Sequence, residues 1–344
     1  MGRIPPINRR AASAWALAAL ACISILAIAA ACTVGSASIR LSAVFRALYE
    51  RVTGAACSDE TAALILFRIR MPRAILAYAV GAALSLSGAC MQGIFKNPMA
   101  DPHILGVSSG AALGAAFAIV FGWQLSVLGL GAVSIAAFVG AALAVALVVS
   151  LAGRAGTVGI LLSGIAVGSF LTALLSGMLI MNRDSMENVY LWTMGSFTAA
   201  SWNKVWLALP VTALGALLIQ PFARDLNAML LGESDARSLG IPVEKVRIIV
   251  LALTTLVTAT AVSLCGIVGF VGLMVPHAVR LVTGPDHRAL LPASLLAGGL
   301  FLLIMDTLAR TVAMPFEIPV GVLTSLLGGP FFLVLLRRHR HAGS

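Results

Sequence analysis

Long, uninterrupted apolar runs dominate the pattern of hydrophobic and polar positions along this chain. Most are close to the about 20 residues that a helix needs to cross a bilayer, whereas a membrane β-strand has about ten residues of alternating polarity. The pattern therefore predicts an all-α polytopic membrane protein with about ten transmembrane helices. The predicted spans are 14–34, 74–95, 104–121, 126–150, 157–181, 203–221, 248–268, 269–283, 290–309 and 320–336.

Two of these spans follow each other in 248–283 without a polar break. As one helix this stretch would be about 54 Å long, far more than a hydrocarbon core of about 30 Å. Gly266, Gly269 and Gly272 give the backbone freedom to turn, and Pro276 is expected to disrupt any helix that runs through it. We therefore expect the chain to turn inside this stretch.

Composition supports the membrane assignment. Hydrophobic residues make up 60% of the 344 residues, charged residues only 10%, and the mean hydropathy is +1.02. A soluble domain carries about 25% charged residues. Since lipid offers no hydrogen bonds, the backbone groups of these runs must bond to each other, which continuous apolar runs achieve as helices.

Arginines at both ends orient the predicted spans. The tail 1–13 and the tail after residue 336 are rich in arginine, and such segments stay in the cytoplasm. Both termini are therefore expected to be cytoplasmic, as an even number of spans requires. This orientation places the segment 35–73 outside, where its arginines run against the charge rule. They are Arg40, Arg46, Arg51, Arg68, Arg70 and Arg73.

The first apolar run ends in A-A-A-C-T, so a signal peptide or a lipid-modified Cys32 is an alternative to a span. The run has about 21 residues, which exceeds the 7–15 of a signal h-region, and we interpret it as a span. The 5 cysteines show no metal-ligand spacing. We expect them to be small, buried hydrophobic residues, and we predict no metal site.

Motifs of catalytic chemistry do not assemble in this sequence. Residues 106–110 match the G-x-S-x-G of a hydrolase, but that motif needs a strand-to-helix turn with a histidine and an acid nearby. Here it opens an apolar run, so Gly106, Gly110 and Gly114 are interpreted as a ridge for close helix packing. No catalytic residue is predicted, and the chain is not expected to be an enzyme.

Ionisable residues inside spans are functional candidates by default. Asp306 lies four residues before Arg310, so the pattern favours a local ion pair on one helix. His277 has no acid or histidine at ligand spacing and is interpreted as a packing residue.

The chain also lacks a nucleotide-binding motif. None of its lysines, Lys96, Lys204 and Lys245, follows a glycine, so it contains no G-x-x-x-x-G-K-[ST] phosphate loop. If the chain is a transport protein, it has neither a nucleotide site nor carboxylates for a coupled ion at the membrane midplane. It is then a channel, an unusual carrier, or part of a machine whose motor is another chain.

The largest connection on the predicted cytoplasmic side, 222–247, favours the last of these possibilities. Gly232 and Gly240 bracket E-S-D-A-R-S-L, and Pro242 opens the next element. The pattern predicts two short helices with a glycine turn between them, a shape suited to docking into a soluble partner. A solvated loop is the alternative.

Several motifs in combination resemble the permease subunits of type II ABC importers, the FecCD family, which take up iron–siderophore complexes, haem and cobalamin. The resemblance runs from about Arg68 to Leu336. Its motifs are R-I-R-M-P-R (68–73), K-N-P-M-A-D-P-H-I-L-G-V-S-S-G (96–110), L-W-T-M-G-S-F-T-A-A-S-W (191–202), L-G-E-S-D-A-R-S-L-G-I-P (231–242), G-F-V-G-L-M-V-P-H-A-V-R-L (269–281), D-H-R-A-L-L-P (286–292) and E-I-P-V-G-V-L-T (317–324).

The resemblance implies one permease domain, 1–344, in the cytoplasmic (inner) membrane, with spans 2–5 and 7–10 as two inverted halves. It also implies a homodimer, two ATP-binding cassette subunits that hold ATP and Mg, and a periplasmic or lipid-anchored substrate-binding protein. Membrane lipid is a further expected partner, and nucleic acid is not. No cofactor is expected on this chain itself.

By the same resemblance, the loop 222–247 contains the coupling helices that contact the ATPases. Arg70, Arg73 and Arg310 match external arginines that grip acidic residues of the binding protein, a role that suits the planar, permanently charged guanidinium. Anchoring to phosphate headgroups is the alternative, and it is preferred for Arg40, Arg46 and Arg51. The expected ATPase contacts are Gly232, Glu233, Ala236, Arg237, Leu239 and Gly240.

The resemblance further assigns Asn97 and Thr157 to a cytoplasmic gate, although Asn97 could equally cap the helix break before Pro98. Segment 182–202 is expected to form an external vestibule, while an aromatic belt is the commoner role of tryptophans at this depth. The vestibule candidates are Arg183, Trp192, Met194 and Trp202.

The sequence does not encode the cargo directly. A pathway lined by Ala, Ser, Thr, Met and Gly suits a bulky chelate better than a bare metal ion, which needs carboxylates or imidazoles. We expect a ferric siderophore first, then haem, then cobalamin, with oxyanions still open. A stand-alone secondary carrier or channel is the alternative of another class.

Overall fold

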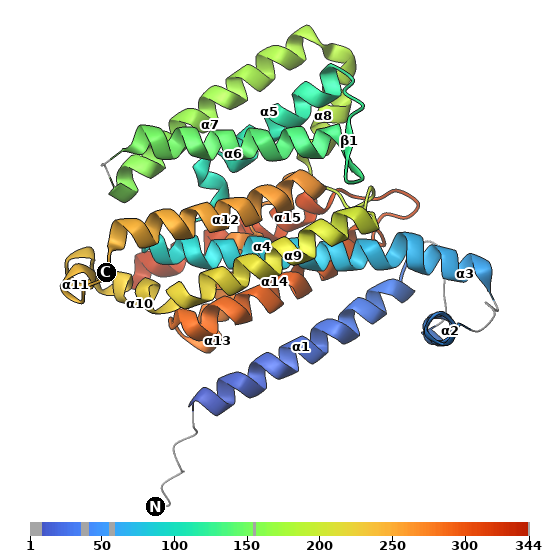
Figure 1. The fold of residues 1–344 in the computed structure, drawn as a ribbon, viewed down its shortest axis with the longest axis horizontal. Coiled ribbons are helices and arrows are strands. Elements are labelled where there is room, and N and C mark those ends of the chain that lie inside the picture. The colour runs from blue at the N-terminus through green and yellow to red at the C-terminus, as the bar shows by residue number, and fades with distance from the viewer. Residues whose placement is uncertain (1–8, 36–40, 55–58, 154–155, 343–344) are drawn as a thin grey trace, which may run out of the picture.

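The computed structural model describes residues 9–35, 41–54, 59–153 and 156–342, and helices dominate it (Figure 1). Seven stretches of these described residues are long and apolar enough to cross a membrane, and shorter apolar helices occupy the other predicted spans. The span helices are α1 (Arg9–Thr33), α4 (Met71–Ile94), α5 (Val107–Val120), α6 (Ala132–Ala152), α7 (Gly156–Met181), α9 (Trp202–Ile219), α12 (Val243–Cys265), α13 (Val271–Thr283), α14 (His287–Ala309) and α15 (Val320–Ala342).

Short elements connect the span helices. The predicted span 126–150 begins later than expected, because 126–131 fold into a small antiparallel hairpin. The connecting elements are α2 (Leu41–Thr53), α3 (Glu60–Leu64), the π-helix η1 (Ile65–Arg70), the 3-10 helices η2 (Pro102–Leu105), η3 (Arg183–Ser185) and η4 (Gln220–Phe222), α8 (Met186–Thr193), α10 (Ala223–Leu231), α11 (Glu233–Ser238), β1 (Ser126–Val127) and β2 (Leu130–Gly131).

Helix α4 is the centre of the larger helix group, with α14, α13, α12 and α9 around it. Small residues let these backbones approach closely, as is common between helices in lipid. A Cβ at Gly81 would collide with the backbone carbonyl of Gly298, and one at Gly88 with the backbone of Gly272. Larger side chains at these glycines would therefore force α4 away from α14 and α13.

Helices α5, α6 and α7 form a second group, drawn in green tones in Figure 1. The expected small-residue ridge of α5 is confirmed at Gly110 and Gly114, which face Gly140 and Ala136 of α6 without room for a Cβ. Gly106 does not belong to this ridge. It has a φ of 77° and forms the left-handed turn before α5.

The turn expected within 248–283 is confirmed. Helix α12 ends at Cys265, the left-handed Gly266 (φ 82°) follows, and α13 begins after Phe270, which is itself left-handed (φ 68°). The expectation that Pro276 disrupts a helix is wrong, because α13 continues through it. Helix α5 also starts after a left-handed residue, Gly106. The helix break before α5 and the break before α13 therefore have the same local backbone feature.

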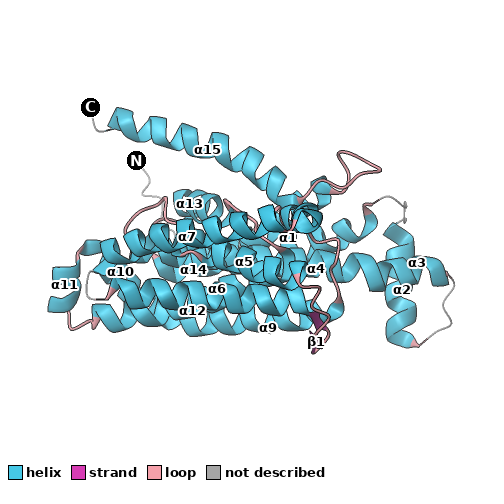
Figure 2. Cartoon of the chain, turned by 90° about the horizontal axis from the view of Figure 1, so that it is seen from above, coloured by secondary structure: helices cyan, strands magenta, loops and turns pink. Residues whose placement is uncertain are grey.

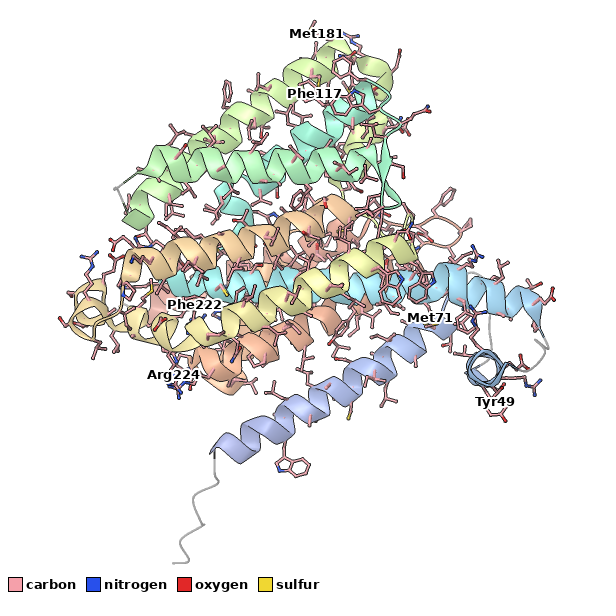
Figure 3. All side chains as sticks on the ribbon, in the orientation of Figure 1. Tyr49, Met71, Phe117, Met181, Phe222 and Arg224 are labelled. Atoms are coloured by element: carbon pink, nitrogen blue, oxygen red, sulfur yellow. The ribbon has the colours of Figure 1, made fainter. Side chains whose placement is uncertain are left out.

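The packing of the two predicted halves follows a matching pattern. Helix α4 packs on α13 and α14 of the second half, and α12 packs on α5 and α6 of the first. Helix α15 diverges from the other helices (Figure 2). Tyr49 of α2 and Arg224 of α10 lie at opposite ends of the molecule (Figure 3).

Candidate functional site

The predicted elbow within 222–247 is confirmed as a structure, with α10 and α11 joined at Gly232. Gly232 has a φ of 152°, which L side chains rarely adopt. Leu226 and Met229 of α10 and Ala236 of α11 are each 0% exposed. The elbow is therefore packed against the body of the protein and is not a solvated loop.

Charged side chains of the elbow bond to one another and to the start of α12. Glu233 accepts a hydrogen bond from the buried Arg247, and Arg237 donates to Glu244 over 2.8 Å. Arg237 and Leu239 remain largely exposed, whereas Ala236 is enclosed. Among the expected ATPase contacts, Arg237 and Leu239 thus lie at the surface, and Ala236 and Glu233 hold the elbow in place. Gly240 closes α11 with a φ of 82°.

A polar junction that the sequence did not predict joins α10 to α14. Asn227 Nδ2 donates to Asp286 Oδ1 over 2.6 Å, and Asn227 Oδ1 accepts from the His287 backbone N over 2.8 Å. The hydrogen bond from the Arg288 backbone N–H lowers the pKa of the Asp286 carboxyl below its usual value. His287 is fully buried against Gly93 at the end of α4. In the sequence, the D-H-R motif at 286–288 is the feature that could have indicated this junction.

The arginines predicted to be external, Arg70, Arg73 and Arg310, are each at least nine-tenths buried. Arg73 donates from Nε and Nη2 to Asp306, with the ion pair at 2.9 Å, and from Nη1 to Glu317 at 2.9 Å. The expected local ion pair of Asp306 with Arg310 is present, but it is not the main one. Arg310 Nε lies 3.9 Å from Asp306, so the nearer partner is Arg73 on α4.

The other two arginines hold the end of α1. Arg70 donates to the carbonyls of Cys32 and Thr33 at 3.0 and 2.9 Å, and Arg310 donates to the carbonyl of Ala31 at 2.6 Å. The carboxyl end of a helix favours a nearby cation, because it carries unpaired carbonyls and a partial negative charge. Docking to a binding protein stays a prediction for these residues.

The two helix breaks face each other around a cavity of about 450 Å³. His103 lies at its wall, with Nε2 3.1 Å from the Val268 carbonyl and Nδ1 bonded to Ser108 Oγ. The sequence analysis did not anticipate this contact of Ser108 with a histidine. Ser108, His103 and Asp101 do not form a hydrolase triad. The Asp101 carboxylate accepts a hydrogen bond from the His103 backbone N and lies 3.9 Å from His103 Nε2.

The gate candidates differ in their local role. Asn97 is exposed, and its Oδ1 accepts from the Met99 backbone N over 2.9 Å, as expected of a residue that caps the helix break. Thr157 lies half-buried at the start of α7. A gating function stays a prediction for both.

The vestibule candidates have different local environments, and lining a vestibule stays a prediction for them. Arg183 is exposed in η3, and Trp192 is half-buried against the core. The Met194 carbonyl accepts from the Gly321 backbone N over 3.1 Å. Trp202 donates its indole N–H to the Phe67 carbonyl over 2.7 Å. Within the described part of the chain, no group of three or more His, Cys, Asp or Glu residues could hold a metal ion.

Comparisons with known proteins give a consistent result. The model of the FecCD transport family matches residues 22–338. The chain is 48% identical over 281 residues to the cobalamin import system permease protein BtuC of Halobacterium salinarum, covering 81% of this chain and 74% of that protein. It is 40% identical to the hemin transport system permease protein HmuU of Yersinia pestis, covering 90% and 93% of the two chains.

A solved structure extends the likeness to three dimensions. An inward-facing structure described as a metal-chelate type ABC transporter matches with a TM-score of 0.82 and 29% identity, over 94% of this chain and 98% of that one. The Fe(3+) dicitrate transport system permease protein FecD of Escherichia coli is 38% identical, over 80% of this chain and 86% of that protein.

Proposed function

Because the chain belongs to the FecCD transport family, we propose that it moves a metal chelate across the cytoplasmic membrane by alternating access, driven by ATP hydrolysis on a separate subunit. It is a multi-pass permease of an ABC importer. The observation that supports the mechanism best is the packed elbow of α10 and α11, which exposes Arg237 and Leu239 while Asn227 bonds directly to the start of α14. Movement of a docked ATPase would therefore reach α14 through a hydrogen-bonded junction.

The proposed assembly contains two copies of this chain, two ATP-binding cassette subunits and an external substrate-binding protein. Helices α7 and α15 agree with a homodimer, because both expose apolar side chains such as Phe170 and Leu326. Carboxylates of the binding protein would reach Arg73 from its Glu317 side, since the opposite side is occupied by the buried Asp306.

The cargo class is a siderophore, haem or a corrinoid. The composition of the spans suits a bulky chelate, and we keep a ferric siderophore as the first candidate, while the 48% identity to a cobalamin permease moves cobalamin to second place. The low number of acids in the predicted pathway argues against a bare metal ion.

Uptake of labelled cargo tests this function. Cells would express the chain with its ATPase and binding protein, and each of ferric siderophore, haem and cobalamin would be supplied in turn. We expect one cargo to accumulate, and to stop accumulating when the Walker lysine of the ATPase is replaced. Accumulation that persists in that variant would instead support a stand-alone carrier or channel.

A further inference from the structure

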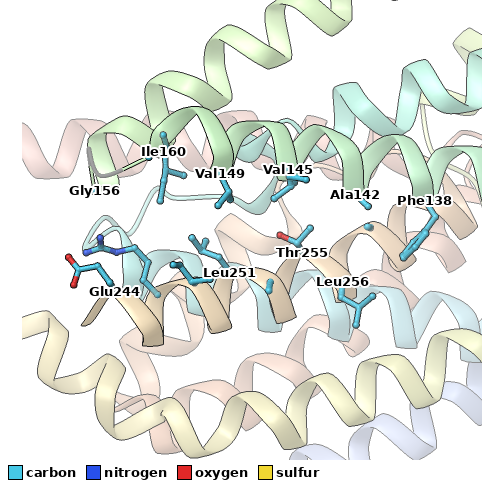
Figure 4. A pocket seen from close by; sticks show the side chains of 17 residues that line it. Phe138, Ala142, Val145, Val149, Gly156, Ile160, Glu244, Leu251, Thr255 and Leu256 are labelled. Carbon is cyan, nitrogen blue, oxygen red and sulfur yellow. The ribbon is translucent and has the colours of Figure 1, made fainter. Parts of the chain in front are cut away.

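A long groove runs between α6 and the start of α7 on one side and α12 on the other, with a volume of about 810 Å³. Figure 4 shows the side chains of the two walls pointing toward one another. Apart from its cytoplasmic end, the lining is almost entirely apolar, with Phe138, Val145, Leu251 and Leu256 among the larger side chains.

The groove has the length of one bilayer leaflet. Along α12 its mostly apolar part extends from Ile248 to Ala259, beyond the charged Glu244 and Arg247 at one end. Twelve residues of helix rise about 18 Å, and half of a hydrocarbon core is about 15 Å. Because α12 starts directly after the elbow, Arg247 lies only about 6 Å along the helix, near the expected level of the lipid headgroups.

One basic and one acidic residue, Arg247 and Glu244, line the headgroup end of the groove, and each also has an ion-pair partner in the elbow. Arg247 is only 4% exposed, and its Nε, which has no hydrogen-bond partner among the described residues, belongs to a side chain that lines the groove. A buried guanidinium N–H without an acceptor is costly, and an incoming phosphate oxygen would satisfy it. Glu244 lines the same end, and its side chain is 64% exposed.

We propose that this groove binds a phospholipid of the inner leaflet with a zwitterionic phosphoethanolamine headgroup. One acyl chain lies between α6 and α12, the phosphate accepts from Arg247 Nε, and the primary ammonium donates to the Glu244 carboxylate. A choline headgroup has no N–H to donate, and a glycerol headgroup brings no cation to Glu244. The lipid would join α12, which begins at the elbow, to the α5–α6–α7 group.

Lipid retention measures this directly. The assembled permease complex would be purified from membranes of equal phosphatidylethanolamine, phosphatidylcholine and phosphatidylglycerol content, and the retained lipid quantified by native mass spectrometry. We expect phosphatidylethanolamine to be enriched by roughly tenfold over the other two. Retention of phosphatidylglycerol above phosphatidylethanolamine, or of no lipid at all, would overturn the proposal.

Three variants, Ala252→Phe, Glu244→Gln and Arg247→Lys, locate the site, with one control variant. Ala252→Phe fills the groove from the exposed face of α12 and should lower retention by roughly tenfold. Ala213→Phe, at an exposed position of α9 outside the groove, is the matched control and should retain lipid normally. Glu244→Gln should keep total lipid but remove the preference for ethanolamine over choline.

The third variant, Arg247→Lys, keeps a cation beside Glu233 but has no Nε, and should lower retention several-fold. Normal retention in Ala252→Phe, or an unchanged headgroup preference in Glu244→Gln, would contradict the proposal. If a second copy of the chain fills the groove instead, Ala252→Phe would weaken the dimer without releasing lipid, which also overturns it. The assay needs neither cargo nor ATP, so its outcome is independent of the transport test.

Discussion

At the scale of single residues, the external arginines are structural as well as candidate docking groups. Arg70 and Arg73 stood out because six arginines in one segment predicted to be external broke the charge rule, whereas only the family resemblance indicated Arg310. The sequence could not identify their partners, since Asp306 and Glu317 lie more than 230 positions away from Arg73 along the chain. Such long-range pairs depend on the packing of α4 against α14, which periodicity does not reveal.

Replacing Arg73 alone should destabilise the protein strongly. Arg73→Ala leaves Asp306, which is 0% exposed, as a buried charge without its nearer partner, a change that costs about 3–5 kcal/mol. The double variant Arg73→Met with Asp306→Leu removes both charges and should recover most of that loss. Thermal unfolding in detergent measures both. An unchanged unfolding midpoint in Arg73→Ala, or a double variant no more stable than Arg73→Ala, would contradict this prediction.

Glu317 is expected to compete with the binding protein for Arg73. Its side chain is 39% exposed, so removing its charge should cost little stability but leave Arg73 Nη1 open to an external carboxylate. Glu317→Gln should tighten binding of the substrate-binding protein by roughly fivefold, about 1 kcal/mol. Interferometry with the immobilised permease complex checks this. Weaker or unchanged binding would argue against docking at Arg73.

At the scale of elements, local sequence chemistry predicted the breaks and the elbow well. Gly232 and Gly240 marked the elbow, and Gly266 marked the end of α12. The errors came from tertiary context. Pro276 stays within α13, and the hairpin at 126–131 shortens α6, although both stretches are apolar enough to read as spans. The junction at Asn227 was invisible because its partners lie about 60 positions away.

That junction should transmit movement of the elbow. Asn227→Ala removes the bonds to Asp286 and His287 while leaving Arg237 and Leu239 exposed for the ATPase. We expect ATP hydrolysis by the assembled complex to continue, while uptake falls by roughly tenfold or more. Arg288→Ala is the control, because its exposed side chain makes none of these contacts. Equal losses of hydrolysis and uptake would indicate failed assembly instead.

The same junction gives a pH dependence. The pKa of Asp286 is lowered in the folded protein, chiefly by the Arg288 backbone N–H, so its ionised form stabilises the native state. This stabilisation is complete above the usual aspartate pKa of about 3.9 and is lost as the pH falls through the lower folded value. Asp286→Asn should therefore lose less stability than the native chain between about pH 5 and pH 2. Parallel unfolding curves would contradict this.

At the scale of the whole molecule, the positions of the two termini predict the orientation in the membrane. Helix α1 begins and α15 ends on the side of the molecule where α10 and α11 lie, and α2 and α3 lie at the other end (Figure 1). This arrangement agrees with an even number of crossings. The arginines after residue 336 and at 1–13 favour the cytoplasm for that side.

Reporter fusions test this orientation against its reverse. A reporter that is active only in the cytoplasm should work when fused after residue 344 or inserted into the α11–α12 connection at Gly240. A reporter that is active only outside should work when inserted at Arg183 in η3, between α7 and α8. If the reverse holds, the elbow would face outward, where no ATP-binding subunit could reach Arg237 and Leu239, and the proposed drive from ATP would be impossible. The same orientation decides whether Arg70, Arg73 and Arg310 face the binding protein and whether the lipid groove lies in the inner leaflet.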